Sequence, residues 1–194
     1  MVDYPELIAE ITDRSGDSTV ATRASMYLRM AESAINKALR VAENEAVEVL
    51  TTDEDGIATL PSDFSMVRMV EMGGREAEAI DFPAATLSPF TLPRPSYGYA
   101  IRGDKLLTTV PSADVTLHYY ASIQPLDLTG TNWLIETEPA IYLYAMLVQV
   151  FEARMEADKA LAAQAKFDSL TGEKRRADAI VRFGRKPFRA AGAL

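Results

Sequence analysis

Few residues in this sequence could carry out covalent or metal chemistry. It has no cysteine, which excludes disulfide scaffolds, thiolate zinc sites, iron–sulfur clusters and cysteine nucleophiles. Its single histidine, His118, lies between Leu117 and Tyr119 in an alternating segment. A structural histidine, hydrogen-bonded within a sheet face, is therefore the favoured interpretation, and a catalytic base is the alternative. Any Ser-His-Asp triad would have to use this one histidine.

The acidic residues are arranged as surface charge. Asp53, Glu54 and Asp55 precede Gly56 with the carboxylate density of a calcium loop, but without its full ligand spacing or its closing glutamate. A turn is favoured, and a cation site is the alternative. The glycine patterns of phosphate-binding and dinucleotide-binding loops are missing, as is the Gly-x-Ser-x-Gly elbow. The sequence therefore predicts no enzyme, no catalytic residue, no metal and no cofactor.

Positive charge is concentrated at the C-terminus. Residues 174–194 carry seven of the 20 basic side chains and one acid, Asp178, which gives +6; since the whole chain has −8, residues 1–173 have −14. A basic end on an acidic body indicates a partner-binding segment, and a solvated end is the alternative. This segment could lie in a groove on another protein or contact nucleic acid. The acidic body favours the protein groove. The candidate partner-binding residues are Arg182, Arg185, Lys186, Phe188 and Arg189.

Helical periodicity occurs at both ends of the chain. Tyr4, Leu7, Ile8 and Ile11 share one face of a first helix. A second helix is expected over residues 18–43. Its apolar positions are Met26, Tyr27, Met30, Ala34, Ile35, Ala38 and Leu39. Its polar side holds Arg23, Arg29, Glu32, Asn36, Lys37 and Arg40. A buried helix begins at Pro139, and a last one covers residues 157–182, weakened or kinked at Gly172.

The middle of the chain alternates with the period of β-strands. Strands are expected over residues 45–52, 57–60, 66–72, 97–102, 105–110 and 115–121. In the last of these, Val115, Leu117, Tyr119 and Ala121 share one face. Residues 81–97 contain four prolines, and a loop of this length is usually functional or disordered. Tyr119, Tyr120 and Trp133 are expected to be core residues at the junction between sheet and helix.

These patterns predict an α+β fold. Residues 1–44 and 139–183 form a helical bundle from the N- and C-terminal helices, and residues 45–138 form an inserted small antiparallel β subdomain that contains the proline-rich loop 81–97. Residues 184–194 form the basic tail. No apolar run is long enough to span a bilayer, and the N-terminus lacks the features of a secretory signal. We therefore expect a soluble protein made in the cytoplasm and no membrane partner.

Four short motifs, in order, resemble the head-to-tail adaptor (connector) proteins of tailed bacteriophages, including the tail tubular protein A type. They are Leu-Pro-Ser-Asp-Phe at 60–64, Val-Thr-Leu-His-Tyr-Tyr at 115–120, Thr-Asn-Trp-Leu at 131–134 and Pro-Ala-Ile-Tyr-Leu-Tyr at 139–144. With the order of elements, the resemblance spans most of residues 4–183.

The resemblance implies a structural protein of the virion neck, made in the cytoplasm of the bacterial host. It implies a homo-oligomeric ring, typically a dodecamer, that docks beneath the portal protein and above a downstream tail, stopper or nozzle protein. DNA would pass through the ring without specific binding. The resemblance also implies that terminal segments tie the ring to its neighbours, which makes the basic tail a candidate portal-contacting arm. The alternative function is a cytoplasmic nucleic-acid-binding or regulatory protein that uses this tail.

Overall fold

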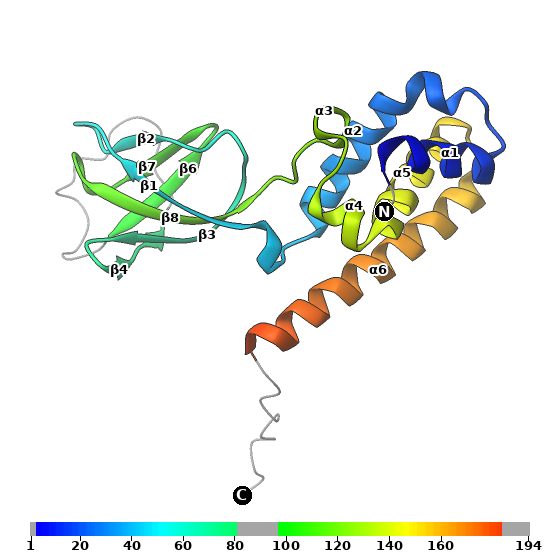
Figure 1. The fold of residues 1–194 in the computed structure, drawn as a ribbon. Coiled ribbons are helices and arrows are strands. Elements are labelled where there is room, and N and C mark those ends of the chain that lie inside the picture. The colour runs from blue at the N-terminus through cyan, green and yellow to red at the C-terminus, as the bar shows by residue number, and fades with distance from the viewer. Residues whose placement is uncertain (1–2, 81–96, 184–194) are drawn as a thin grey trace, which may run out of the picture. The chain divides into compact units, whose positions relative to one another are not determined.

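The computed structural model describes residues 3–80 and 97–183, which form two units. The helical unit contains the residues up to Glu43 and those from Ile123 onward, and the β unit contains Asn44–Ser122. Each has its own apolar core. Nearly all of the proline-rich loop and the tail at 184–194 lie outside the described residues. Helices at both chain ends and strands between them confirm the predicted α+β fold (Figure 1).

The helical unit is built around one buried helix. Its helices are α1 (Tyr4–Ser15), α2 (Val20–Ala38), α3 (Leu126–Thr129), α4 (Trp133–Thr137), α5 (Pro139–Ala153) and α6 (Ala157–Phe183). α5 is apolar on nearly every side, which is typical of a helix covered all round. It is packed against α1, α2, α4 and α6. The terminal helices therefore meet around α5, as their apolar faces predict.

Two of the predicted helices, α2 and α6, differ from the sequence prediction. α2 ends at Ala38 because Leu39 is extended, and a short 3₁₀ helix, η1 (Ala42–Asn44), follows. α6 passes through Gly172 without interruption. The buried Phe167 and Thr171 hold this part of α6 on the core, and this packing outweighs the weak helix propensity of glycine.

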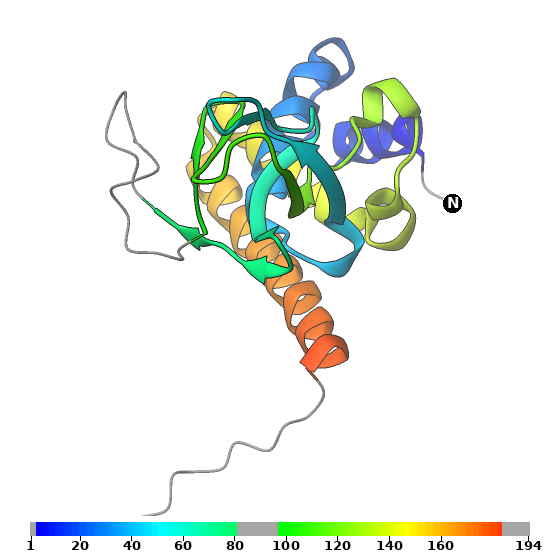
Figure 2. The same ribbon diagram turned by 90° about the vertical axis from the view of Figure 1, so that its left-hand side faces the viewer.

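The β unit contains two four-stranded sheets. Its strands are β1 (Glu45–Thr51), β2 (Ile57–Thr59), β3 (Phe64–Met72), β4 (Arg75–Glu76), β5 (Glu78–Ala79), β6 (Gly98–Arg102), β7 (Lys105–Thr108) and β8 (Asp114–Ala121). The sheet orders are β1-β8-β3-β4 and β2-β7-β6-β5. The pairs are antiparallel except β5–β6, which is parallel and was not predicted. Figure 2 shows the strands curving around a common interior.

The predicted face of β8 is confirmed. Val115, Leu117 and Tyr119 are buried in the β core, while Thr116 and His118 lie on the other face of the strand, because successive side chains of a strand point to opposite faces. The segment at 123–138 groups with the helices, although the sequence pattern placed it in the β subdomain. The reason is that Leu126, Leu134 and Ile135 are buried in the helical core.

Among the described residues, no helix combines the length and the apolar character needed to cross a membrane.

Candidate partner-binding surfaces

Two of the adaptor-like motifs pack against each other in the β unit. The hydroxyl of Tyr119 donates to Oδ1 of Asp63 at 3.0 Å, and the backbone N–H of Ser122 donates to the Asp63 carbonyl at 2.6 Å. The rings of Phe64 and Tyr119 lie 5.8 Å apart. These contacts join the start of β3 to the end of β8. The Asp-Phe and Tyr-Tyr motifs thus have a structural role here.

The other two motifs meet at Asn132 in the helical unit. Oδ1 of Asn132 accepts hydrogen bonds from the N–H groups of Leu134 and Ile135, each at 3.1 Å, and so caps α4. Its Nδ2 donates to the Gln124 carbonyl at 2.9 Å and to the Tyr142 hydroxyl at 2.7 Å. One buried amide therefore connects the segment before α4 to α5.

Glu32 on α2 completes this network. Its Oε1 accepts a hydrogen bond from the N–H of Leu126 at 2.8 Å and a long one from the Tyr142 hydroxyl at 3.5 Å. The side chain is 7% exposed. Burial raises the pKa of this carboxyl above its usual range, although the hydrogen bond from Leu126 opposes the shift. The sequence analysis placed Glu32 on the polar side of its helix, and that placement is wrong because α3 covers it.

Replacing Glu32 by glutamine is expected to change how stability depends on pH. Since the folded state raises the pKa of Glu32, the folded protein binds this proton more tightly than the unfolded chain, so the wild-type protein loses stability as pH rises from the usual glutamate pKa through the raised one. Glu32→Gln removes this loss. In thermal unfolding from about pH 4 to about pH 7, the unfolding temperature of the variant should rise relative to that of the wild type as pH rises. A constant difference between the two proteins would contradict the expectation, and Glu54→Gln, at an exposed turn position, is the control.

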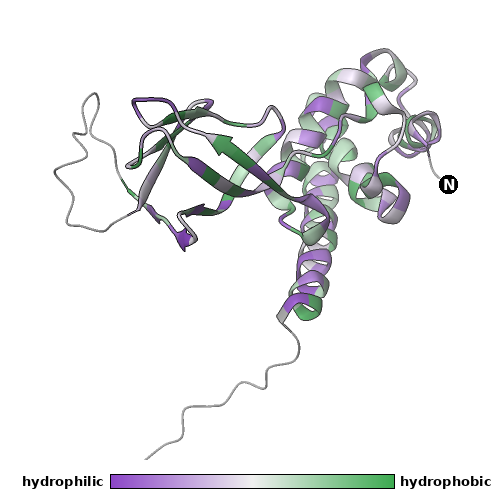
Figure 3. Cartoon of the chain, turned by 60° about the vertical axis from the view of Figure 1, so that its left-hand side comes forward, coloured by the Kyte–Doolittle hydropathy of each residue, from purple (hydrophilic) through white to green (hydrophobic). Residues whose placement is uncertain are grey.

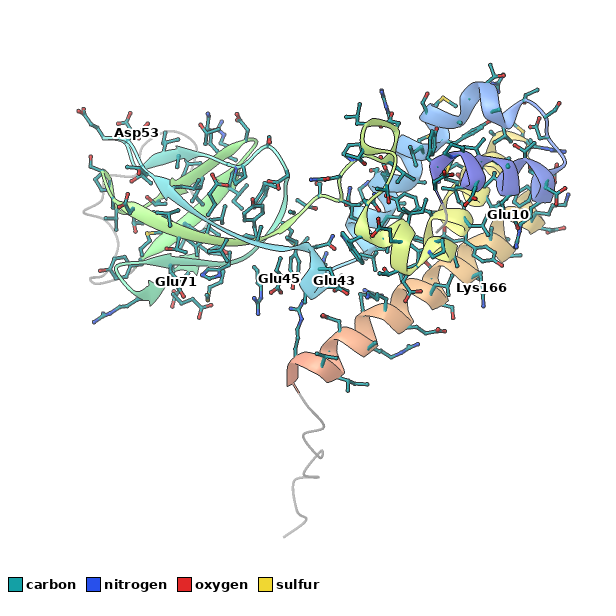
Figure 4. All side chains as sticks on the ribbon, in the orientation of Figure 1. Glu10, Glu43, Glu45, Asp53, Glu71 and Lys166 are labelled. Carbon is teal, nitrogen blue, oxygen red and sulfur yellow. The ribbon has the colours of Figure 1, made fainter. Side chains whose placement is uncertain are left out.

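His118 was the candidate catalytic residue, and the turn at Asp53 was the candidate cation site. Nε2 of His118 is 3.8 Å from Oε2 of Glu71, too long for the hydrogen bond that the sequence analysis expected, and this buried atom has no hydrogen-bond partner in the described part of the chain. Oδ1 of Asp53 accepts from the N–H groups of Asp55 and Ile57 at 3.0 and 2.8 Å, which fixes the turn after β1 (Figure 4). In the described ranges no three potential metal ligands cluster.

The basic C-terminal end of α6 is attached to the helical unit. Lys174 is 2.7 Å from Glu43 and lies over the ring of Trp133 at 5.6 Å. Asp178 accepts a hydrogen bond from the N–H of Ala42 at 3.0 Å and pairs with Nε of Arg182 at 2.7 Å. Trp133, which lies beneath Lys174, is partly buried and packed against the core of the helical unit. Figure 3 shows hydrophilic and hydrophobic residues side by side at this end of α6.

The structure describes only the first of the five candidate tail residues. Arg182 is held by Asp178 on its own helix. Arg185, Lys186, Phe188 and Arg189 lie outside the described residues. The exposed cations on this part of α6 are Arg175 and Arg176.

Two exposed methionines were missed as surface residues. Met26 and Met30 were assigned to the apolar face of their helix, but they are 49% and 47% exposed. At 100° per residue they fall on the same side of α2 as Arg23 and Arg29. Plotting the helix at this angle could have separated them from the core positions Leu28, Ala31 and Ile35.

The exposed methionines of α2 are suited to contacts with other proteins. A family model described as SU10 adaptor protein matches residues 2–187 of the sequence, so the chain belongs to this family. A search of curated proteins gives no match. Membership of the family confirms the resemblance to phage adaptors. The closer likeness to the tail tubular protein A type stays a prediction.

The protein is accordingly a structural adaptor of a bacteriophage virion, located at the head–tail junction and interacting with other head and tail proteins. Its family is not a known class of enzymes.

Proposed function

We propose that this adaptor forms a homo-oligomeric ring, dodecameric by its resemblance to connector proteins, that joins the portal protein to a downstream tail, stopper or nozzle protein. The ring would be made in the host cytoplasm and would let DNA pass from head to tail. The observation that carries the proposal is the family match, which covers both units and almost the whole chain.

The division of charge supports a passage for DNA. Residues 1–173 have a formal charge of −14, and an acidic wall repels phosphate groups, so DNA could slide past it without specific binding. The basic end would then serve a protein partner. Arg182, Arg185, Lys186, Phe188 and Arg189 are proposed to form an arm that contacts the portal. Asp178 pairs with Arg182 and also accepts a hydrogen bond from the N–H of Ala42. These two contacts anchor the end of α6, from which the proposed arm would start.

A chain that ends at Phe183 is expected to lose binding to the portal while it stays folded. The truncation removes four of the five proposed arm residues and leaves every described contact in place. Co-sedimentation with purified portal complexes measures binding, and circular dichroism measures folding. Reversing the sign of Arg185, Lys186 and Arg189 in the full chain is a second variant, expected to weaken binding in the same way. Equal portal binding by the truncated and full-length chains would remove the arm from the proposal.

The +6 charge of residues 174–194 also favours a second candidate, a nucleic-acid-binding protein. A salt series separates the two functions, because each phosphate contact releases counterions and makes affinity fall steeply with salt. If the chain binds DNA at low salt, releases it as the salt concentration rises and does not bind the portal, the second function holds and the adaptor ring does not.

A further inference from the structure

The outward side of α2 is basic and apolar. Seven residues share an arc of about 120° on the helix, and all seven are exposed: Thr22, Arg23, Met26, Arg29, Met30, Ser33 and Lys37. We call them the α2 face. The single acid of α2, Glu32, is turned into the core. The α2 face therefore presents two methionines among three cations, and methionine is an adaptable side chain in protein contacts.

A second exposed apolar surface lies where α5 turns into α6. Here Glu152, Met155, Ala157, Ala160, Leu161 and Gln164 line an open groove of about 480 Å³. We call it the α5–α6 groove. Met155 is 92% exposed and Leu161 is 69% exposed. The only charged group in its lining is the carboxylate of Glu152.

The backbone at the groove adds a further observation. Met155 has φ of 57°, the left-handed position that often ends a helix and that glycine occupies without strain. A methionine there costs backbone energy and leaves its side chain in solvent, which contributes nothing to the fold of the isolated chain. Such local strain is found at functional sites.

The two surfaces lie on different sides of the helical unit. α2 and α6 each pack against α5 (Figure 1). Met26 and Met30 on α2 and Leu161 on α6 are exposed, so they are turned away from α5, which is about 10 Å across. The α2 face therefore cannot cover the α5–α6 groove of its own chain. It can reach the groove of a second copy.

We propose that the α2 face of one copy docks on the α5–α6 groove of the next copy. Met26 and Met30 would contact Met155 and Leu161. Arg29, whose side chain is 77% exposed although it lies 3.8 Å from Asp127, would face Glu152. In this contact the apolar side chains of the α2 face pack on those of the α5–α6 groove, and Arg29 pairs with the carboxylate of Glu152, the single charged group in the lining of the groove. A contact between two different patches is heterologous, and it closes into a ring when the rotation between copies allows. The inference rests on the ring of the proposed function.

Crosslinking tests this contact directly, because the chain has no cysteine of its own. In the portal-bound assembly, the double variant Met30→Cys/Leu161→Cys should form a ladder of disulfide-linked multimers on mild oxidation. Within one chain, α5 separates the two positions by more than the reach of a disulfide. The control Met30→Cys/Val181→Cys uses an exposed position on another side of α6 and should stay monomeric on a denaturing gel.

Charge reversal gives a second readout. Arg29→Glu and Glu152→Arg should each reduce ring assembly, and the combined variant should restore it. If a ring of wild-type mass forms but the cysteine pair crosslinks no better than its control, and both single reversals assemble normally, the docking proposal is overturned while the proposed function stands. If the wild-type chain forms no ring with the portal, the proposed function itself fails.

Discussion

Replacing Asn132 by alanine is expected to lower the free energy of unfolding of the helical unit by about 2–4 kcal/mol. The loss of the cap on α4 accounts for about 1 kcal/mol. The buried Tyr142 hydroxyl would lose the hydrogen bond that Asn132 donates, and a buried polar group left without this partner costs about 1–3 kcal/mol. The Gln124 carbonyl loses its bond as well, but Gln124 is exposed and water can replace the amide there.

Urea unfolding followed by the fluorescence of Trp133 measures this change, because Trp133 is the only tryptophan of the chain and begins α4. Asn132→Ser keeps an oxygen that can cap the helix but loses the amide donor, so an intermediate loss is expected. Thr131→Ala, at the exposed neighbouring position, should have little effect. A loss below about 1 kcal/mol for Asn132→Ala would show that the network does not hold the unit together.

Leu117→Ala is expected to destabilise the β unit by about 2–5 kcal/mol. Leu117 is fully buried on β8, the strand that pairs with both β1 and β3. Shortening it removes buried apolar surface and leaves a cavity between the strands, and a leucine-to-alanine change in a core costs this much. Its partner on β3, Val70, is buried as well.

Hydrogen exchange measured by mass spectrometry on peptides from β1, β3 and β8 reports this loss within the β unit. Thr116→Ala changes the neighbouring, half-buried position on the other face of β8 and is the matched control, with an expected change below about 1 kcal/mol. Unchanged protection of these strands in Leu117→Ala would contradict the assignment of Leu117 to the core.

Local periodicity was enough to predict the longer elements. The 3.6-residue spacing of α1 and the alternation of β8 each reflect one face turned to a core, and the structure has Leu7 and Ile11 of α1 and Val115, Leu117 and Tyr119 of β8 buried. The end of α2 at Ala38 was missed because its apolar spacing continues through Leu39, which is extended although it is buried. α3 and α4 were missed because helices of four and five residues are too short to show a period.

Which side chains are exposed on the α2 face and in the α5–α6 groove was harder to predict from the sequence. Met26 and Met30 lie beside true core positions on α2, and hydropathy alone does not separate a buried methionine from an exposed one. Glu32 was assigned to solvent because nothing in the local sequence shows that Leu126 and Tyr142, more than ninety residues away along the chain, would surround it. The groove at Met155 depends on how α5 and α6 pack.

The assembly state of the protein on its portal tests the account most directly. Light scattering of the purified chain, alone and mixed with the portal protein, gives the mass of the complex, and negative-stain images show its form. The account predicts a ring of many copies, dodecameric by the resemblance, seated on the portal. A chain that stays monomeric in the presence of the portal, at concentrations where both proteins are soluble, would contradict it.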